Sequence, residues 1–341
     1  MEKLMFKSTL NPVVSVLLVI MLFAVAGQTV VKADTVVQSI AVGNTPMDVA
    51  VSPSGDRVYV TNQGSNTVSV INTSTNTVIA TVAAPTGSIL TNLAVSPDNT
   101  KVFVVSQNTG VLILSTSGLT FNPTPITVGT TPIDVAFDSS GRAYVTNYTS
   151  QTVSIINTSN GLAGTVNVHE GARGVTVTNV SGNDRVYVAF AGGSNSEVGY
   201  FAAGGGSVTY ITVAGGPFFI AARPDGTRVY TSLNVHNKTA SISTSTDAVL
   251  ASLNDSGTTP FGIAVAATPT GNRVFVADSN GNGIGWNLTR IDSATPDAVL
   301  TQLAVTKKPK GVAANPAGTR IYVACLGTGT AGKVDVIDTT F

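Results

Sequence analysis

The sequence predicts an all-β protein, a seven-bladed β-propeller with four antiparallel strands in each blade. Three observations lead to this prediction. Two short motifs each recur seven times along the chain, and a spare strand precedes the first repeat. The composition, rich in Gly, Ser, Thr and Val with only 11% charged residues, is typical of short strands joined by tight turns.

The first motif is an aliphatic residue followed by a small one, after a polar turn. It recurs at spacings of 40 to 49 residues, and a period of about 40 to 45 residues is typical of propeller blades or solenoid turns. The seven copies are Val49-Ala50, Leu93-Ala94, Val135-Ala136, Val175-Thr176, Ile220-Ala221, Ile263-Ala264 and Val312-Ala313.

The second motif follows the first within ten residues and consists of a basic residue, an aliphatic or small residue and then Tyr or Phe. Turns rich in Gly, Asn and Pro, such as 53–56, separate the two motifs and suit a tight hairpin. Each repeat therefore opens with two antiparallel strands. The seven copies of the second motif begin at Arg57, Lys101, Arg142, Arg185, Arg228, Arg273 and Arg320.

Two further strands complete each repeat. In the first repeat they are the alternating runs 67–71 and 77–82, and four strands make one blade of a propeller. The last repeat, 311–338, holds only three strands, so we expect the spare strand at 35–42 to complete it and close the ring. No stretch after residue 33 carries a convincing helical period, which argues against helical repeats.

Residues 1–33 are predicted to be a signal peptide, and residues 34–341 the propeller. Basic residues precede an apolar run from 13 to 27, which is too short to span a bilayer comfortably. Cleavage is expected after Ala33, with Ala26 as the rival site. The mature chain would then be secreted, periplasmic or on the cell surface, with no membrane span.

The charge balance of the exported chain argues against some partners. Residues 34–341 carry 15 basic and 17 acidic side chains, a net charge of about −2, which gives no general attraction to nucleic acid or anionic lipid. The single Cys325 cannot form an internal disulfide. We expect a monomer that needs no cofactor.

The first repeat contains Val-Tyr-Val-Thr-Asn at 58–62, followed by the runs 65–71 and 75–78, and the tetrad Tyr-Val-Thr-Asn returns at 144–147. In these residues the chain resembles the YVTN-repeat family of β-propellers. The resemblance covers essentially the whole exported chain, although the tetrad is less clear in the other repeats. The resemblance implies a propeller fold and export, and it implies no single reaction because members of the family serve many purposes.

The loops that lead into the innermost strands differ from blade to blade, and variable loops on a rigid scaffold are where binding sites lie. Together they would surround the mouth of the central channel with apolar walls and a few polar groups, as expected of a small-ligand pocket. The alternative is that these side chains merely fill the channel. The candidate ligand-binding residues are Asp48, Asn92, Asp134, Arg173, Phe218, Phe219, Phe261 and Lys310.

A second set of candidates on the same face is catalytic: His169, Glu170, Arg173 and His236. A His–carboxylate pair in a cleft can act as a general base, and two His with one Glu can hold a metal. Solvated loop histidines are the simpler interpretation. The run 278–283 matches the start of a calcium loop through Asp278, Asn280 and Asn282, but Thr289 stands where a bidentate Glu is needed, so no metal site is predicted.

The leading functional prediction is therefore a binding propeller outside the cytoplasm that holds a protein, a glycan or a small molecule at its channel mouth. The first alternative is a hydrolase or lyase, similar to propeller lactonases, that uses the histidine set. The second is single-stranded nucleic-acid binding near Lys307, Lys308 and Lys310, which the net charge disfavours. No recognisable catalytic motif decides between them.

Overall fold

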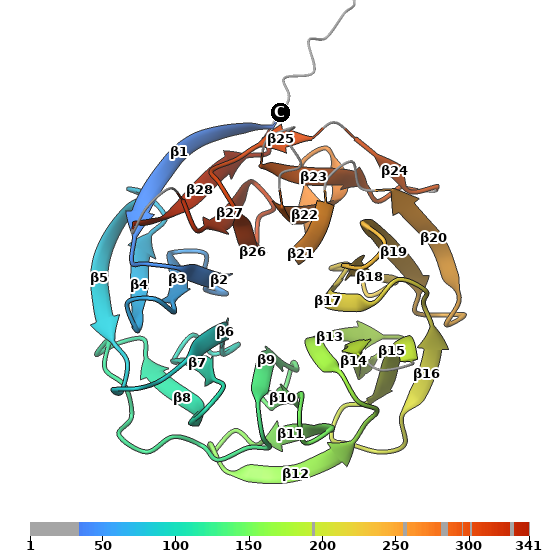
Figure 1. The fold of residues 1–341 in the computed structure, drawn as a ribbon, viewed down its shortest axis with the longest axis horizontal. Helices are drawn as coiled ribbons and strands as arrows, with labels where there is room; N and C mark the ends of the chain where they lie inside the picture. Colours follow the sequence, from blue (N-terminus) through green and yellow to red (C-terminus); the bar gives the residue numbers. More distant parts are fainter. Residues whose placement is uncertain are drawn as a thin grey trace, which may run out of the picture. The chain divides into compact units, whose positions relative to one another are not determined.

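The computed structural model describes residues 34–192, 195–254, 258–280, 286–294, 296–300, 302–327 and 331–340. Within these residues the chain forms one compact unit, Asp34–Thr340, in which seven antiparallel sheets surround a central axis (Figure 1). The predicted seven-bladed propeller is confirmed. The predicted signal peptide lies outside the described residues.

Each blade runs outward from the axis, so that its first strand is the innermost. Blade 1 is β2 (Pro46–Val51), β3 (Arg57–Asn62), β4 (Thr67–Asn72) and β5 (Thr77–Ala83). Blade 2 is β6 (Leu90–Val95), β7 (Lys101–Ser106) and β8 (Gly110–Ser115). Blade 3 is β9 (Pro132–Phe137), β10 (Ala143–Asn147), β11 (Thr152–Ile156) and β12 (Leu162–Asn167).

The remaining blades follow the same order. Blade 4 is β13 (Ala172–Val180), β14 (Asn183–Gly192), β15 (Asn195–Ala202) and β16 (Thr209–Thr212). Blade 5 is β17 (Pro217–Ala222), β18 (Arg228–Leu233), β19 (Lys238–Ser243) and β20 (Val249–Asn254). Blade 6 is β21 (Thr258–Thr268), β22 (Gly271–Asn280), β23 (Asn287–Asp292), β24 (Ala298–Val299) and β25 (Leu303–Ala304). Blade 7 is β26 (Pro309–Ala314), β27 (Arg320–Cys325), β28 (Gly332–Asp338) and β1 (Thr35–Val42).

Two blades have an irregular outer edge. In blade 2 the fourth strand is reduced to two isolated bridges, Val111 with Ile126 and Leu114 with Phe121. In blade 6 the outer edge is broken into the short strands β24 and β25, both paired with β23. The inner strands of both blades pair with their second strands as in the other blades, so the irregularity is confined to the outer edge.

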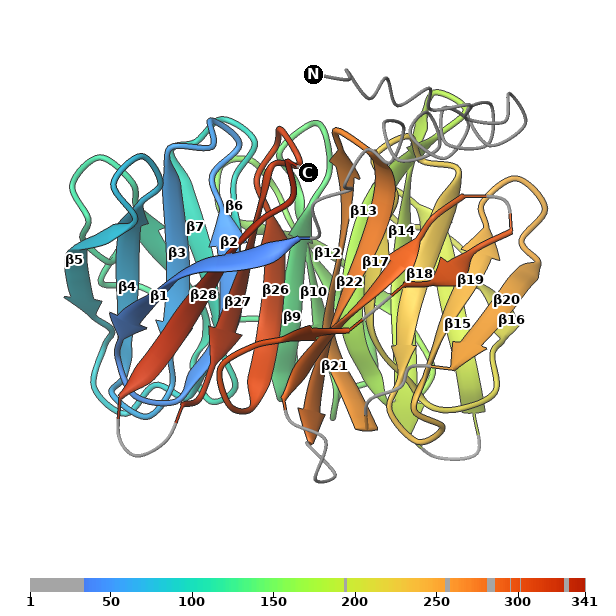
Figure 2. The same ribbon diagram turned by 90° about the horizontal axis from the view of Figure 1, so that it is seen from above.

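The ring is closed by the two ends of the described chain, as the spare strand predicts. Strand β1 pairs antiparallel with β28, from Thr35 opposite Asp338 to Val42 opposite Gly332. Figure 2 shows β1 lying along β28 at the outside of blade 7. Sharing one blade between both ends removes the open sheet edges that an unclosed ring would leave.

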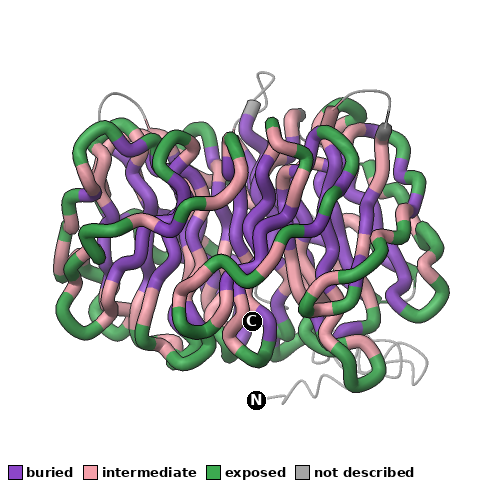
Figure 3. Tube along the Cα trace, turned by 90° about the horizontal axis from the view of Figure 1, so that it is seen from below, coloured by how far each residue is buried: buried purple, intermediate pink, exposed green. Residues whose placement is uncertain are grey.

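Both sequence motifs have a structural explanation. The aliphatic-small pairs lie in the innermost strands, and the aromatic residues of the second motif are buried, with Tyr59, Tyr144 and Tyr230 at most 1% exposed. The hydrophobic core is divided among the blade interfaces: one cluster joins Tyr59 of blade 1 to Leu93 of blade 2. Buried segments follow the strands and exposed ones gather at the turns (Figure 3).

The basic residue of the second motif fastens neighbouring blades. The Arg57 Nη1 donates to the Thr116 carbonyl at 2.5 Å, Arg185 Nη1 donates to the Thr244 carbonyl at 3.1 Å, and Arg228 Nη1 donates to the Ala294 carbonyl at 2.9 Å. In each case the acceptor belongs to the next blade. In these blades the recurring arginine makes an inter-blade hydrogen bond, because its guanidinium can satisfy a turn carbonyl while its stem covers apolar surface. Arg142 and Arg320 instead pair with Asp138 and Asp338 of their own blades.

The last residue of the tetrad supports the hairpin between the second and third strands. Asn62 Nδ2 donates to Thr67 Oγ1 at 3.2 Å and to Ser69 Oγ at 2.9 Å. In blade 6 the same position is Asp278, whose Oδ2 accepts from Thr289 Oγ1 at 2.6 Å. Asp278, the first residue of the partial calcium-loop match, is 2% exposed and lies within β22. The side chain of Asn280 and the whole of Asn282 lie outside the described residues.

In the part of the chain that the structure describes, no helix has the length and apolar character needed to cross a membrane.

Candidate functional site

The residues expected to border the channel lie on the innermost strands rather than in the loops that lead into them. They are the second and third residues of β2, β6, β9, β13, β17 and β26, and the fourth and fifth of β21. This correction has a physical reason: most of these strands start at a proline, whose fixed φ suits the first residue of a strand. The candidates therefore sit on a rigid ring.

The polar side of the channel is formed by blades 1 to 3. Asp48 Oδ2 accepts a hydrogen bond from the Leu93 amide of the next blade at 3.2 Å. Asp134 Oδ2 accepts from the Val175 amide of its next blade at 2.9 Å, and the Asn92 side chain also hydrogen-bonds Asp134. Each polar residue thus joins its own inner strand to the one beside it.

These two carboxyl groups have shifted acidities. Burial and, to a lesser extent, the charge of Asp134 raise the pKa of Asp48 from its ordinary 3.8 to about 7, against the lowering effect of hydrogen bonds from the Val49 and Leu93 amides. Burial raises the pKa of Asp134 to about 6, against hydrogen bonds from Val175, Val135 and Asn92 that lower it. Carboxyl groups that titrate near neutrality in a cavity are typical of functional sites, although structural networks also produce them.

The opposite side of the channel is aromatic. Phe218, Phe219 and Phe261 form a cluster with ring centroids 5.0 to 5.2 Å apart. Lys310 Nζ lies 4.0 Å from the centroid of the Phe261 ring, a cation–π contact. Burial lowers the pKa of Lys310, and the charge of Lys308 adds to that effect. The aromatic wall is therefore already a surface against which one cation rests.

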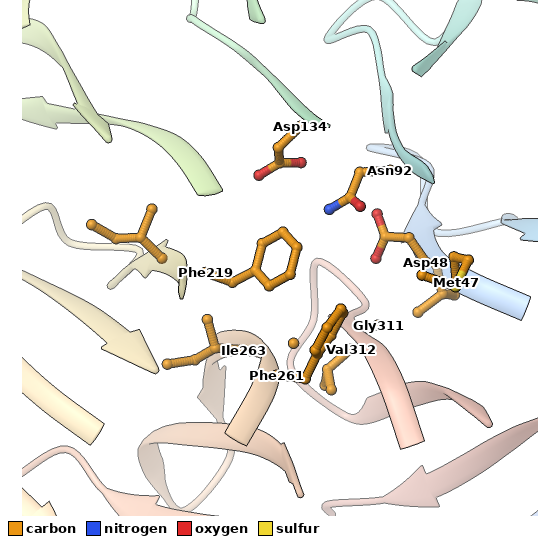
Figure 4. A pocket seen from close by; sticks show the side chains of 12 residues that line it. Met47, Asp48, Asn92, Asp134, Phe219, Phe261, Ile263, Gly311 and Val312 are labelled. Atoms are coloured by element: carbon orange, nitrogen blue, oxygen red, sulfur yellow. The ribbon is translucent and has the colours of Figure 1, made fainter. Parts of the chain in front are cut away.

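Five of the eight ligand-binding candidates line a single cavity of about 130 Å³ in the channel: Asp48, Asn92, Asp134, Phe219 and Phe261. Figure 4 shows Asn92 beside the two carboxylates, with Phe219 and Phe261 across from them. The rest of the apolar lining is Met47, Val49, Ile220, Ile263 and Val312. An apolar cavity of about 150 Å³ can hold benzene, so this one has room for a small organic group.

The other candidates lie elsewhere on the same face. Arg173 and Phe218 line a different hollow, between blades 4 and 5, and His236 from the β18–β19 loop lines it too. Lys310 packs on Phe261. The structure therefore divides the predicted ring into a central cavity and a neighbouring hollow.

The catalytic candidates are not brought together as the sequence suggested. His169 lies in the β12–β13 loop, where its Nδ1 contacts Glu197 Oε1 and its ring stacks on Tyr210 with centroids 3.8 Å apart. The carboxylate that contacts His169 is thus on β15, not the adjacent Glu170, which is exposed. His236 lines a hollow whose lining does not include His169.

Sequence reasoning missed two side chains that matter here. Glu197 contacts His169 from 28 residues away, and Tyr148 packs on Arg173, with the guanidinium carbon 4.8 Å from the ring centroid. Neither residue stands in a recurring motif, because both come from positions that vary among the blades. The blade alignment does place Tyr148 in a β10–β11 turn on the channel-mouth face, which is the signal that would have found it.

Comparison with known proteins identifies the fold and no family. No family model matches the chain. A stretch covering 16% of this chain is 54% identical, over 54 residues, to the PE-PGRS family protein PE_PGRS18 of Mycobacterium tuberculosis. That match spans 11% of the mycobacterial protein, so it covers too little of either chain to indicate a shared function.

Solved structures resemble nearly the whole chain at low identity. Hydrazine synthase of Kuenenia stuttgartiensis is 19% identical with a TM-score of 0.73, covering 92% of this chain and 98% of that one. Virginiamycin B lyase from Staphylococcus aureus is 17% identical with a TM-score of 0.70, covering 88% and 99%. The WD40 repeats of RRP9 are 12% identical with a TM-score of 0.75, covering 90% and 99%. At such identities the likeness shows the propeller fold alone.

Proposed function

We propose that this chain is a binding propeller that works outside the cytoplasm and holds a small molecule with an ammonium group in its central channel. The observation that carries the proposal is the cavity itself, with Asp48 and Asp134 on one side and Phe219 and Phe261 on the other. Carboxylates bind ammonium groups by charge-assisted hydrogen bonds, and aromatic faces attract the same charge. A small molecule fits this hollow better than a protein or a glycan, which would need a broader surface.

The alternative for these residues is a purely structural role. Asp48 and Asp134 each bind a backbone amide of the next blade, so they would be needed in a ring that binds nothing. Two features indicate that these carboxyl groups also bind a ligand. They border open space, and their raised pKa values indicate that the protein alone does not fully stabilise their charge. A bound cation would supply the missing stabilisation.

Titration with matched small ions tests the proposal. We expect primary ammonium ions from methylammonium to benzylammonium to bind saturably at pH 8, as measured by calorimetry, and carboxylates of equal size not to bind in this cavity. Asp48→Asn keeps an acceptor for the Leu93 amide and removes the charge, so it should weaken ammonium binding by roughly tenfold or more. Saturable ammonium binding that is equal in wild type and Asp48→Asn would contradict the proposal, and so would its complete absence.

Export is the second part of the proposal, and it is supported by the sequence of residues 1–33. N-terminal sequencing of the protein recovered from its host should give a chain that begins at Asp34 or at Gly27. Recovery from the cytoplasm of an uncleaved chain that begins at Met1 or Glu2 would contradict export.

An enzymatic function, as a hydrolase or lyase, remains the second candidate because of one contact. His169 Nδ1 contacts Glu197, and a carboxylate that orients an imidazole is the arrangement of a general base with its partner. If the protein turns over a lactone or ester, His169→Ala and Glu197→Gln should each reduce kcat by a factor of about 100 or more. Full activity in both variants would exclude this pair from the reaction.

A further inference from the structure

A second hollow, of about 390 Å³, opens between blades 4 and 5 on the face where the innermost strands begin. Its polar lining comes from Arg173 on β13, Ser196 on β15 and the loop residues Asn234 and His236. Phe218 and Val235 supply the apolar part. The hollow thus combines a fixed positive charge with hydrogen-bonding groups and apolar walls.

Arg173 is held in this hollow by aromatic rings. Its guanidinium carbon lies 4.4 Å from the centroid of Phe218 and 4.8 Å from that of Tyr148. Its Nε donates to the Ala191 carbonyl at 3.5 Å, and burial lowers its pKa. Among the described residues, no ion pair with a carboxylate involves Arg173, in contrast to Arg142, Arg185 and Arg228, each of which pairs with an aspartate.

Two glycines shape the floor of the hollow. Gly215 and Gly216 have φ angles of 121° and 68°, which side chains rarely adopt. A Cβ on Gly215 would lie 2.9 Å from His236 Nδ1, so the imidazole packs directly on the bare backbone. The Val235 amide also donates to the Gly215 carbonyl at 3.1 Å. The His236 loop is therefore fixed against the turn that leads into β17, the strand of Phe218.

We propose that this hollow is a binding site for a small organic carboxylate. A guanidinium matches a carboxylate through two parallel N–H donors, and stacking on rings fixes the plane of that fork before the ligand arrives. His236 offers an N–H donor in either tautomer. Phe218, together with Val235, which is 73% exposed, would cover the apolar part of the ligand. This site takes the opposite charge to the central cavity and does not depend on it.

Benzoate is the probe, with phosphate as the inorganic comparison, and both are titrated into the purified protein by calorimetry. Benzoate should bind saturably and more tightly than phosphate, because phosphate gains nothing from the apolar wall. Arg173→Gln should weaken the binding of benzoate roughly tenfold to a hundredfold. The affinity of wild type for benzoate should fall as the salt concentration is raised. The control variant Arg185→Gln removes an arginine that also stacks on tyrosines but already has Asp247 as a partner, and it should leave benzoate binding unchanged.

Each other outcome would overturn the proposal. Absence of saturable benzoate binding by wild type would show that the hollow is not a carboxylate site. Equal affinity in wild type and Arg173→Gln would place bound benzoate elsewhere, and tighter binding of phosphate than of benzoate would replace the carboxylate with an inorganic anion. Ammonium binding in the central cavity is measured on the same Arg173→Gln protein, and it should persist. If Arg173→Gln loses only benzoate binding and its thermal unfolding curve is unchanged, the hollow is a site distinct from the central cavity, and the loss is not caused by misfolding.

Discussion

The inner ring is joined in two different ways on its two sides. In blades 1 to 3 the residue before the aliphatic position is Asp48, Asn92 or Asp134, and the carboxylates reach the amides of the next blade. In blades 4, 6 and 7 the same position is glycine, at 174, 262 and 311. One side is therefore joined through side chains and the other through close backbone contact.

The glycines are required by that contact. A Cβ on Gly262 would lie 2.1 Å from the Lys310 carbonyl oxygen, and one on Gly174 would lie 2.6 Å from the Phe219 Cα. At the closure of the ring, a Cβ on Gly311 would lie 2.4 Å from Asp48 Oδ1. Where side chains make the joint, the strands leave polar groups bordering open space, whereas backbone contact leaves room for the phenylalanines of blades 5 and 6.

This difference teaches that a repeated fold can acquire a one-sided site without changing its strands. The cavity lies between the two kinds of joint because carboxylates border it from one side and aromatic rings from the other. The same carboxylates stabilise the ring and give it charge. Substitutions of the glycines should therefore change the stability itself, whereas substitutions of the carboxylates should change how stability depends on pH.

The largest effect is expected for Gly262→Ala. The added Cβ would meet the Lys310 carbonyl, so the inner strands must separate, and the free energy of unfolding should fall by about 3 kcal/mol. Gly164→Ala in β12 is the matched control, because nothing lies within 4 Å of a Cβ there, and it should change stability by no more than about 0.5 kcal/mol. Equal stability of the two variants in urea unfolding would contradict the close contact between blades 6 and 7.

Asp48→Asn should change how stability depends on pH. The folded protein holds the Asp48 proton more tightly than the unfolded chain, since the pKa is about 7 against an ordinary 3.8. This group's contribution to stability is therefore complete below about pH 4 and is lost as pH rises through 7. The free energy of unfolding of Asp48→Asn should therefore increase relative to that of wild type by about 4 kcal/mol between pH 4 and pH 8.

An exposed carboxylate provides the contrast. Hydrogen bonds from Ser96 and Thr100 hold the pKa of Asp98 below its ordinary value of 3.8, so Asp98→Asn should lose stability relative to wild type as pH rises toward about 4, and the difference should stay constant above that. If Asp48→Asn shows this same direction in urea unfolding at several pH values, the carboxyl group of Asp48 is not strained by burial.

A smaller effect of the same sign is expected for Asp134→Asn. The pKa of Asp134 is raised only to about 6, so the gain over wild type should be complete by about pH 7 and should amount to about 2 kcal/mol. The measurement is urea unfolding at pH 4 and pH 8. A gain larger than that of Asp48→Asn would reverse the order of the two pKa values.

Sequence reasoning predicted the fold well because the fold is repeated. The motifs that begin at Val49 and at Arg57 each recur seven times and so indicate seven equivalent environments. The spare strand 35–42 could pair only where a blade lacked a strand. The outer edges of blades 2 and 6 were not predicted, because they carry no motif and their bridges depend on local chain length.

The candidate site could be predicted only in part. Equivalent positions in the repeats correctly placed Asp48, Asp134 and Phe261 around one axis. Sequence gave no reason to separate Arg173 from that cavity, since the direction of its side chain depends on Tyr148 and Phe218 of neighbouring blades. The contact between His169 and Glu197 could not be predicted either, because these two residues come close only when the strands of blade 4 pair.

The pH dependence of ammonium binding tests the central claim most directly. Asp48 and Asp134 lose their protons with pKa values of about 7 and 6, while a primary ammonium ion keeps its charge. The affinity for butylammonium should therefore rise between pH 5 and pH 8, and the double variant Asp48→Asn/Asp134→Asn should remove the rise. An affinity that is independent of pH in wild type, or a rise that persists in the double variant, would contradict a binding site formed by these two carboxylates.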